Sequence, residues 1–562
     1  MGKKRVITGL IAGIVIVAGI TFAILFATRN TGKSERTIST ESAQHRLEEM
    51  YKKVDPSTAD PVKSSVEYTE DDRTAAELPE LDPAGITCQA PTDLYAEIWS
   101  SPEKAAKSGT DGWMREMAER FNNEKMTVDG KPVSVQIRTM SSGLGVDYIA
   151  SGKAAPAGYT PSNMLFVKLL AARGVACDVI RERTVGNVAG ILLTKDHYDE
   201  IIDKYGSCDL KAITEATGDG TLTMGYTNPF VSSTGLNFLM STLLRYDRQN
   251  PLSEAATDGF RKFQQNVPFV ALTTIQMRDA AERGSLDGFV LEWQLYQNDP
   301  SLSSNYVFTP FGYRHDNPLV VCPTASPTER QILELFASYC DDYGKDLATQ
   351  YGFNGKDDYV AEMPDVNGET LLAAQELYKK NKDIGRPIVA VFVADVSGSM
   401  SGAPLAELQS SLINSMHYIN NDNYVGLVSY DDFVTINVPI AKFDLNQQAL
   451  FKGAIEYLQP GGGTATYDAI IVAADMVEKA IKEIPDSKPM IFVLSDGETN
   501  VGYGLAEIQD VIKGLRIPIY TIGYNANIAA LQKISSINEA ASIDASTDDV
   551  VYQLRNLFNA SM

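Results

Sequence analysis

The chain has 562 residues, of which 44 % are hydrophobic and 22 % charged, so it is long enough for several globular domains of ordinary composition. Its formal net charge of −23 argues against a nucleic-acid-binding surface, which would be basic. None of the five cysteines lies in a C-x-x-C pair, which excludes a zinc ribbon, although an extracellular chain could form one or two disulfides.

The N-terminus carries a membrane signal. Lys3, Lys4 and Arg5 precede an uncharged apolar run, residues 6–28, which would be about 34 Å long as a helix and so would span a bilayer core. We therefore predict a transmembrane anchor over residues 1–28, with a cleaved signal peptide as the alternative. The positive cluster places the short end in the cytoplasm, so the expected location is the cell membrane, single-pass, with an extracellular C-terminal ectodomain.

Residues 29–85 are polar and rich in Ser, Thr, Asp and Glu, with several prolines. Apart from one short helix around residues 43–54, this composition predicts a flexible spacer that holds the ectodomain away from the membrane.

Strand-like and helix-like stretches alternate over residues 86–350. Residues 133–140 read as a strand, 163–174 as a helix, and 221–247 as a strand, a loop and a long apolar helix. This α/β pattern is longer than one typical domain core, so we predict two lobes.

Two loops in this region follow a strand and place paired hydroxyl residues at the start of a helix, where free N–H groups favour anions. The loops "TMSSGLG" and "PFVSSTGLN", with the strand that begins "VGNVAGILL", resemble bacterial extracellular solute-binding proteins of the two-lobed type. The resemblance implies a small-molecule or anion ligand, and the candidate contacts are Ser141, Ser142, Ser233 and Thr234. The alternative is that these residues cap helices without a ligand.

Residues 351–385 contain loops and one helix and are expected to connect two modules. From residue 386 to 562, continuous apolar strands alternate with amphipathic helices. Such strands belong to a parallel sheet covered on both faces, so the predicted fold class is α/β with a doubly wound C-terminal domain.

Three strand ends or helix starts of this C-terminal domain carry oxygen-bearing side chains, in "DVSGSM", "GGGTATYDA" and "LSDGETN". Ligands of such sheets bind beyond the carboxyl ends of the strands. Two carboxylates and three hydroxyls, without nitrogen or sulfur, select Mg²⁺, Mn²⁺ or Ca²⁺. The predicted metal ligands are Asp395, Ser397, Ser399, Thr464 and Asp496. The alternative is a set of serine-rich turns that cap helices.

This D-x-S-x-S sequence, followed by a distant Thr and a distant Asp, resembles the metal-ion-dependent adhesion site (MIDAS) of the von Willebrand factor A (VWA) family. The resemblance implies that Ser397, Ser399 and Thr464 reach the metal directly, while Asp395 and Asp496 act mostly through water. An acidic residue of a protein partner would complete the coordination.

The sequence does not predict an enzyme. Its four histidines are scattered, and no G-x-S-x-G elbow, P-loop or H-E-x-x-H pattern is present, so no catalytic residue is assigned. We expect a bacterial cell-surface adhesion protein that recognises an acidic partner through the metal. The alternative is a solute receptor, for an oxyanion as one example, in a transport or sensing system with the VWA domain as an assembly module.

Overall fold

The computed structural model of the chain describes residues 38–65, 78, 81, 85–107, 111–267, 269–271, 274, 277, 286–361, 363–382, 386–416, 419, 421–497, 499–524, 528–535 and 542–544. The predicted anchor over residues 1–28 lies outside them. Within the described part, no helix combines the length and apolar character that a membrane crossing requires.

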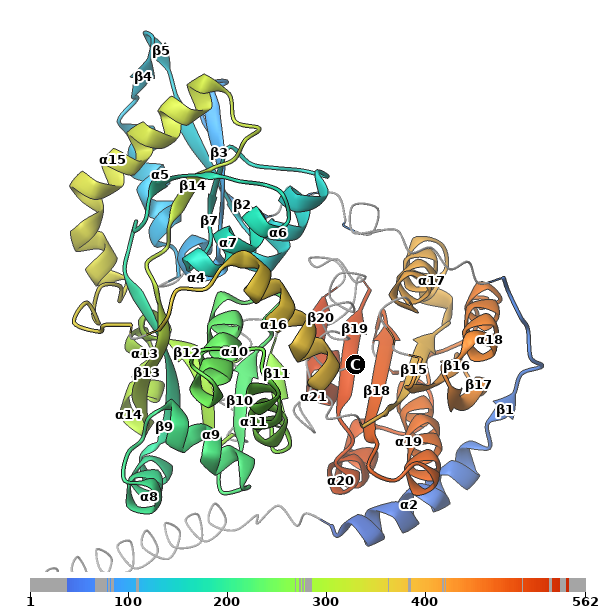
Figure 1. The fold of residues 1–562 in the computed structure, drawn as a ribbon. Coiled ribbons are helices and arrows are strands. Elements are labelled where there is room, and N and C mark those ends of the chain that lie inside the picture. The colour runs from blue at the N-terminus through green and yellow to red at the C-terminus, as the bar shows by residue number, and fades with distance from the viewer. Residues whose placement is uncertain are drawn as a thin grey trace, which may run out of the picture.

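The first lobe is built on a six-stranded sheet of order β2-β6-β3-β7-β14-β8 (Figure 1). Its strands are β2 (Ile86–Cys88), β3 (Tyr95–Ser100), β6 (Ser134–Thr139), β7 (Gly158–Thr160), β8 (Asp178–Arg181) and β14 (Leu319–Val321), with a hairpin of β4 (Thr127–Val128) and β5 (Lys131–Pro132). Its helices are α4 (Pro102–Ala105), α5 (Trp113–Asn123), α6 (Ser142–Ser151), α7 (Met164–Ala172) and α15 (Pro327–Gln350).

The second lobe is built on a five-stranded sheet of order β11-β10-β12-β9-β13. Its strands are β9 (Asn187–Thr194), β10 (Met224–Thr227), β11 (Phe269–Ala271), β12 (Gly288–Glu292) and β13 (Tyr306–His315). Its helices are α8 (Lys195–Tyr205), α9 (Leu210–Gly218), α10 (Ser233–Tyr246), α11 (Glu254–Gln264), α13 (Trp293–Asn298) and α14 (Pro300–Asn305). The chain enters this lobe between β8 and β9 and leaves it between β13 and β14, which gives the two-lobed arrangement that the sequence predicts.

The lobes are closed against each other. The backbone N–H of Gly143, in α6, donates to the carbonyl of Val231 in the second lobe (3.0 Å). A Cβ at Gly143 would lie 1.9 Å from the carbonyl oxygen of Phe230, so only glycine allows this approach. Helix α16 (Gly368–Asn381) packs against α7, α10 and α11, so this helix of the predicted connector belongs to the two-lobed module.

The C-terminal domain is a seven-stranded sheet of order β1-β17-β16-β15-β18-β19-β20 (Figure 1). From residue 388 onward its strands are β15 (Ile388–Asp395), β16 (Tyr424–Tyr430), β17 (Val434–Lys442), β18 (Lys488–Ser495), β19 (Ile519–Gly523) and β20 (Ser542–Asp544). Its helices are α17 (Ala403–Ser415), α18 (Leu445–Glu456), α19 (Thr466–Glu483), α20 (Leu505–Leu515) and α21 (Ile528–Ser535). All its neighbouring strands are parallel except β16 and β17.

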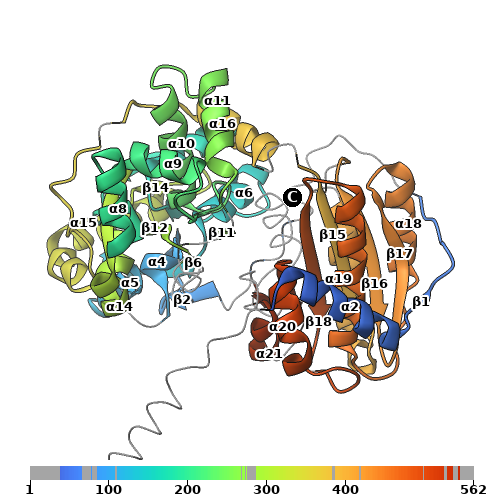
Figure 2. The ribbon, with the colours of Figure 1, turned by 90° about the horizontal axis from the view of Figure 1, so that it is seen from below.

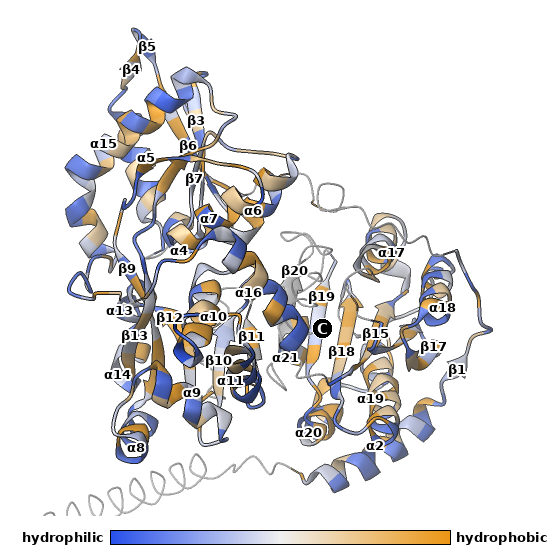
Figure 3. Cartoon of the chain, viewed as in Figure 1, coloured by the Kyte–Doolittle hydropathy of each residue, from blue (hydrophilic) through white to orange (hydrophobic). Residues whose placement is uncertain are grey.

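Alternate residues of β15 face opposite layers of helices, as a strand requires. Phe392 packs in the apolar cluster with α17 and α18, whereas Val391 and Val393 pack with α19 and α20. Figure 3 shows the resulting pattern, with β15 and β18 largely in hydrophobic colours between helices that have hydrophilic outer faces.

Residues 38–65 lie on this C-terminal domain, and we call them the N-terminal strap. Helix α2 (Thr40–Val54) crosses α19 and α20 (Figure 2), and β1 (Ser57–Thr58) adds a parallel edge strand to β17. This corrects the expectation of a flexible spacer for residues 38–65. The predicted short helix is present as α2, but the composition did not show that its apolar face, Ala43, Leu47 and Met50, is buried against this domain.

Candidate functional site

The acid-and-serine residues of the C-terminal domain meet at the carboxyl edge of its sheet. Asp395 is the last residue of β15, and Asp496 directly follows β18, its parallel neighbour. The Ser399 hydroxyl donates a hydrogen bond to Asp496 Oδ1 (2.9 Å), and the Oγ atoms of Ser397 and Ser399 are 3.0 Å apart. Two of the three predicted segments are therefore linked directly through their side chains.

Both carboxylate oxygens of Asp395 are held in place. Oδ1 accepts from the backbone N–H of Ser397 (2.8 Å), and Oδ2 accepts from the hydroxyl of Ser495 (2.6 Å). Asp395, Ser397 and Ser495 are buried, whereas Ser399 is exposed. The site therefore has a fixed, buried carboxylate at Asp395 and is open to solvent at Ser399.

The loop that carries Thr464 is tied to the other two segments. Gly398 N–H donates to the Gly462 carbonyl (3.1 Å), and Gly461 N–H donates to the Val396 carbonyl (2.8 Å). The backbone N–H of Thr464 donates to Asn500 Oδ1 (2.8 Å). These bonds place the Thr464 segment beside the Asp395 segment and beside Asn500. Asn500 and Ser495 are two positioning residues outside the motif.

Electrostatics at this edge favour a cation. Burial raises the pKa of Asp496 and the charge of Asp395 raises it further, although the Ser399 hydrogen bond opposes the shift. In the described residues no group of three or more His, Cys, Asp or Glu side chains is arranged to hold a metal. The site at this sheet edge has only two such side chains, and its other oxygens are hydroxyls. A donor set of two carboxylates and three hydroxyls fits a hard divalent cation.

A small pocket lies between the two lobes of the N-terminal module, with a volume of about 20 Å³. Three of the four predicted ligand residues, Ser141, Ser142 and Ser233, line it. Ser142 and Ser233 come from different lobes and join across the pocket, with the Ser233 hydroxyl donating to Ser142 Oγ (2.9 Å). Thr234 is not in the wall, because its hydroxyl donates instead to Glu292 Oε1 (2.9 Å).

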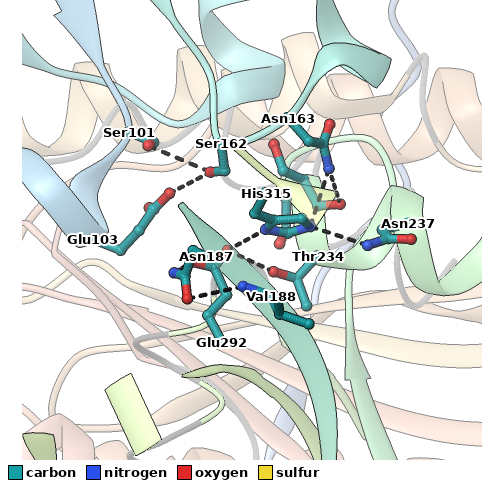
Figure 4. Close-up of polar contacts among 12 residues, drawn as sticks. Ser101, Glu103, Ser162, Asn163, Asn187, Val188, Thr234, Asn237, Glu292 and His315 are labelled. Atoms are coloured by element: carbon teal, nitrogen blue, oxygen red, sulfur yellow. Dashed lines mark hydrogen bonds and ion pairs between the residues drawn. The ribbon is translucent and has the colours of Figure 1, made fainter. Parts of the chain in front are cut away.

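Two buried glutamates that the sequence analysis missed, Glu103 and Glu292, also line this pocket. Glu292 Oε1 lies 2.9 Å from His315 Nδ1, and its Oε2 accepts from the amide of Asn187 (2.9 Å) (Figure 4). Glu103 accepts a hydrogen bond from the hydroxyl of Ser162. Glu292 could have been found from the sequence, because it is an acid that ends an apolar strand, as Asp395 is.

Two carboxyl groups and one ammonium group are buried around the pocket. Burial and the charge of Glu292 raise the pKa of Glu103. Burial opposes ionisation of Glu292, but the His315 imidazole and the Thr234 hydroxyl lower its pKa overall. Burial lowers the pKa of Lys104 to about 8, and its ammonium group donates to Ser101 Oγ, the Thr160 carbonyl and Asn317 Oδ1. The Lys104 ammonium group is therefore occupied by fixed acceptors, while the carboxyl groups of Glu103 and Glu292 line the pocket.

The fold defines the class of protein: an α/β protein with a two-lobed module and a Rossmann-like module. Residues 390–559 match the family model of the von Willebrand factor type A domain, so this part of the chain is a VWA domain, as the sequence analysis predicts.

The relatives cover only parts of the chain. The inter-alpha-trypsin inhibitor heavy chain H3 of Bos taurus is 30 % identical over 158 residues, which are 26 % of this chain; the chain spans 17 % of that relative's length. Solved structures similar to the chain include a periplasmic thiamin binding protein (10 % identity, TM-score 0.39, 51 % of this chain and 95 % of that one). Another is iron-bound HitA of Pseudomonas aeruginosa (14 % identity, TM-score 0.38, 52 % and 99 %).

Proposed function

We propose that this chain is a non-catalytic, membrane-anchored binding protein whose VWA domain recognises an acidic group of a protein partner through a divalent cation. The observation that carries the proposal is the fixed Asp395 carboxylate beside the Ser397, Ser399 and Asp496 oxygens at one sheet edge. Two acids and three hydroxyls supply five oxygens, which leaves one position of an octahedral divalent cation open. An acidic partner side chain approaching the exposed Ser399 would supply the missing oxygen.

The first test is thermal unfolding with Mg²⁺, because an ion that binds only the folded state stabilises that state. At about 100 times the dissociation constant, the gain is about 2.7 kcal/mol. We expect the full-length chain to melt at a higher temperature with Mg²⁺, and Asp395→Ala and Ser399→Ala to lose that increment. Asp422→Ala is the matched control, since its carboxylate is 87 % exposed and precedes β16 at the opposite edge of the sheet. An undiminished increment in Asp395→Ala would refute the metal site.

Partner capture tests the second half of the proposal. A protein bound to the immobilised chain in Mg²⁺ should elute with EDTA, and the Ser399→Ala chain should fail to capture it. Substituting the partner's acidic residues one at a time should identify a single carboxylate that is required. Binding that survives both EDTA and Ser399→Ala would mean that recognition does not use the cation.

The proposed location rests on residues 1–28, and their uncharged run is the supporting observation. The protein should stay with membranes during alkaline extraction, and external protease should digest its ectodomain on intact cells. Release by alkali would contradict the anchor.

The pocket between the lobes favours a second candidate function, the capture of a small solute. Its glutamates make a cationic group a better ligand than an oxyanion, and about 20 Å³ is room for one water-sized group such as an ammonium or a metal ion. A larger ligand would enter only if the lobes open.

Thermal shift with matched probes distinguishes the ligand classes. We expect the chain to be stabilised by a cation, among choline, thiamine, spermidine and Fe³⁺, and not by sulfate or molybdate. Glu103→Gln should abolish the shift, whereas Asp203→Asn, on the exposed face of α8, should keep it. A shift with sulfate alone would favour the oxyanion alternative.

A further inference from the structure

Two thiols of the first lobe lie in contact. Cys177 directly precedes β8 and Cys322 directly follows β14, and these strands pair antiparallel with Asp178 opposite Val321. The next position of that register sets Cys177 opposite Cys322, and their Sγ atoms are 3.8 Å apart. Opposed residues of an antiparallel pair have Cα atoms about 4.5–5.5 Å apart, which is within the range for a disulfide.

The two thiols differ in reactivity. The Cys177 thiolate is stabilised by a hydrogen bond from the Cys322 thiol, which lowers the pKa of Cys177 even though burial and the charge of Asp178 oppose the shift. The same pairing, together with burial, raises the pKa of Cys322 far above its ordinary value. Cys177 is half-buried and Cys322 is buried, so an oxidant meets Cys177 first.

We propose that Cys177 and Cys322 are an oxidation site that closes to a disulfide by exchange with a disulfide-bearing oxidant. The Cys177 thiolate attacks one sulfur of the oxidant, whose S–S bond breaks and releases one thiol. Cys322 then loses its proton and attacks the Cys177 sulfur, and the second thiol leaves. The two cysteines lose two electrons and two protons, and the oxidant disulfide becomes two thiols.

The position of the pair gives the bond a structural consequence. Cys177 lies just before the segment that carries the chain from β8 into the second lobe, and Cys322 just after the segment that returns from β13. The two segments already contact each other, because the Thr184 hydroxyl donates to the Asn317 carbonyl (2.7 Å). A disulfide would link the two interlobe segments covalently at the first lobe. The covalently closed loop would then contain the entire second lobe.

Such a loop is long, because the two cysteines are 145 positions apart in the sequence. Cross-linking a long loop restricts the unfolded chain strongly, so oxidation should raise the melting temperature of the two-lobed module, by about 5 °C or more. Of the five cysteines, all within the described part of the chain, no other two have thiols in recorded contact.

The test uses the full-length protein, treated either with oxidised glutathione or with dithiothreitol. After alkylation and proteolysis, mass spectrometry should find peptides 177 and 322 joined in the oxidised sample, with Cys88, Cys208 and Cys340 alkylated. The oxidised protein should also melt at the higher temperature. Cys322→Ser should abolish both the cross-link and the shift, while Cys208→Ser, whose thiol lies outside the pair, should keep both.

Several outcomes would overturn the proposal. Full alkylation of Cys177 and Cys322 after oxidation would do so, as would a persistent glutathione adduct on Cys177. A cross-link that leaves the melting temperature unchanged would show that the disulfide does not stabilise the two-lobed module. An equal rise in melting temperature in Cys322→Ser would show that other cysteines cause the stabilisation.

Discussion

Ser495 is the last residue of β18 and donates its hydroxyl proton to Asp395 Oδ2 (2.6 Å), which makes it a positioning residue for the proposed cation site. It is fully buried, so no water can replace the bond without rearrangement. The D-x-S-x-S motif does not contain it, and its role is visible only because β18 pairs with β15.

Ser495→Ala should therefore lower the affinity for Mg²⁺ about 10- to 100-fold, because the carboxylate that faces the ion loses its fixed orientation. Isothermal titration calorimetry measures the change. Ser495→Thr, which retains the hydroxyl, should recover most of the affinity, and Ser303→Ala in the distant α14 should have no effect. An unchanged affinity in Ser495→Ala would show that Asp395 needs no such support.

A second residue-scale consequence concerns Lys104, whose ammonium group is buried and whose pKa falls to about 8 in the folded chain. Between that value and the pKa near 10.4 of the unfolded chain, the unfolded state binds more protons. Raising the pH through this window should therefore stabilise the native state relative to Lys104→Met, by an upper bound of roughly 3 kcal/mol. Urea unfolding of both chains at pH 7, 8, 9 and 10 gives the difference, and a flat difference would mean that Lys104 titrates normally.

Among single residues, the sequence identified those that belong to a spaced motif and missed those that act through tertiary contacts. Asp395, Ser397, Ser399 and Asp496 meet as the parallel-sheet argument requires. Glu103 was missed because it lies in a short helix with no recognisable pattern, and only the closing of the lobes brings it near Glu292. The possibility of an anion ligand followed from hydroxyls at helix starts and stays a prediction, because the sequence did not show which carboxyl groups stand opposite them.

At the scale of elements, strands and helices with a clear apolar period were predictable, such as β15 and α10. The helix of the N-terminal strap was predicted, but its attachment was not, because the residues that it contacts lie far along the chain, 378 positions from Ser57 to Thr435 and 434 from Gln44 to Glu478. Its attachment is specific: Gln44 donates to Glu478 (2.7 Å), and Lys479 lies over the ring of Tyr51 at 4.5 Å. Gly514 leaves room for Ala43, since a Cβ there would lie 2.7 Å from the Ala43 methyl.

Leu47 tests this attachment, because it is 1 % exposed in the core shared with α19 and α20. Leu47→Ala should lower the free energy of unfolding of the VWA domain by about 2–5 kcal/mol. The exposed neighbour Glu48 provides the control, since Glu48→Ala should change it by less than about 0.5 kcal/mol. Equal denaturation curves for both variants would mean that the strap contributes nothing to the domain.

At the scale of the whole molecule, the strap makes the C-terminal domain discontinuous in sequence. One part, residues 38–65, precedes the two-lobed module, and the other begins at residue 386, so that module is inserted into the VWA domain. The sequence analysis predicted a linear order of spacer, lobes, connector and domain. It could not predict the insertion, because the pairing of β1 with β17 leaves no local sequence signal.

Fragments can test the insertion. A chain of residues 386–562 should melt at a lower temperature alone than after addition of a peptide of residues 38–65. The same peptide with Leu47→Ala should restore less of the loss. If the peptide leaves the melting temperature unchanged, the strap and the domain do not form one folding unit.

The strap also determines which parts of the molecule would bear mechanical load. If residues 1–28 anchor the chain and the proposed cation site holds a partner, a pull between them would run through α2, β1 and the sheet edge at β17 into β15 and β18. The two lobes lie outside that line of tension, although they lie between its ends in sequence. Under the proposed function, their pocket would therefore open and close at its own rate while the VWA domain is under strain.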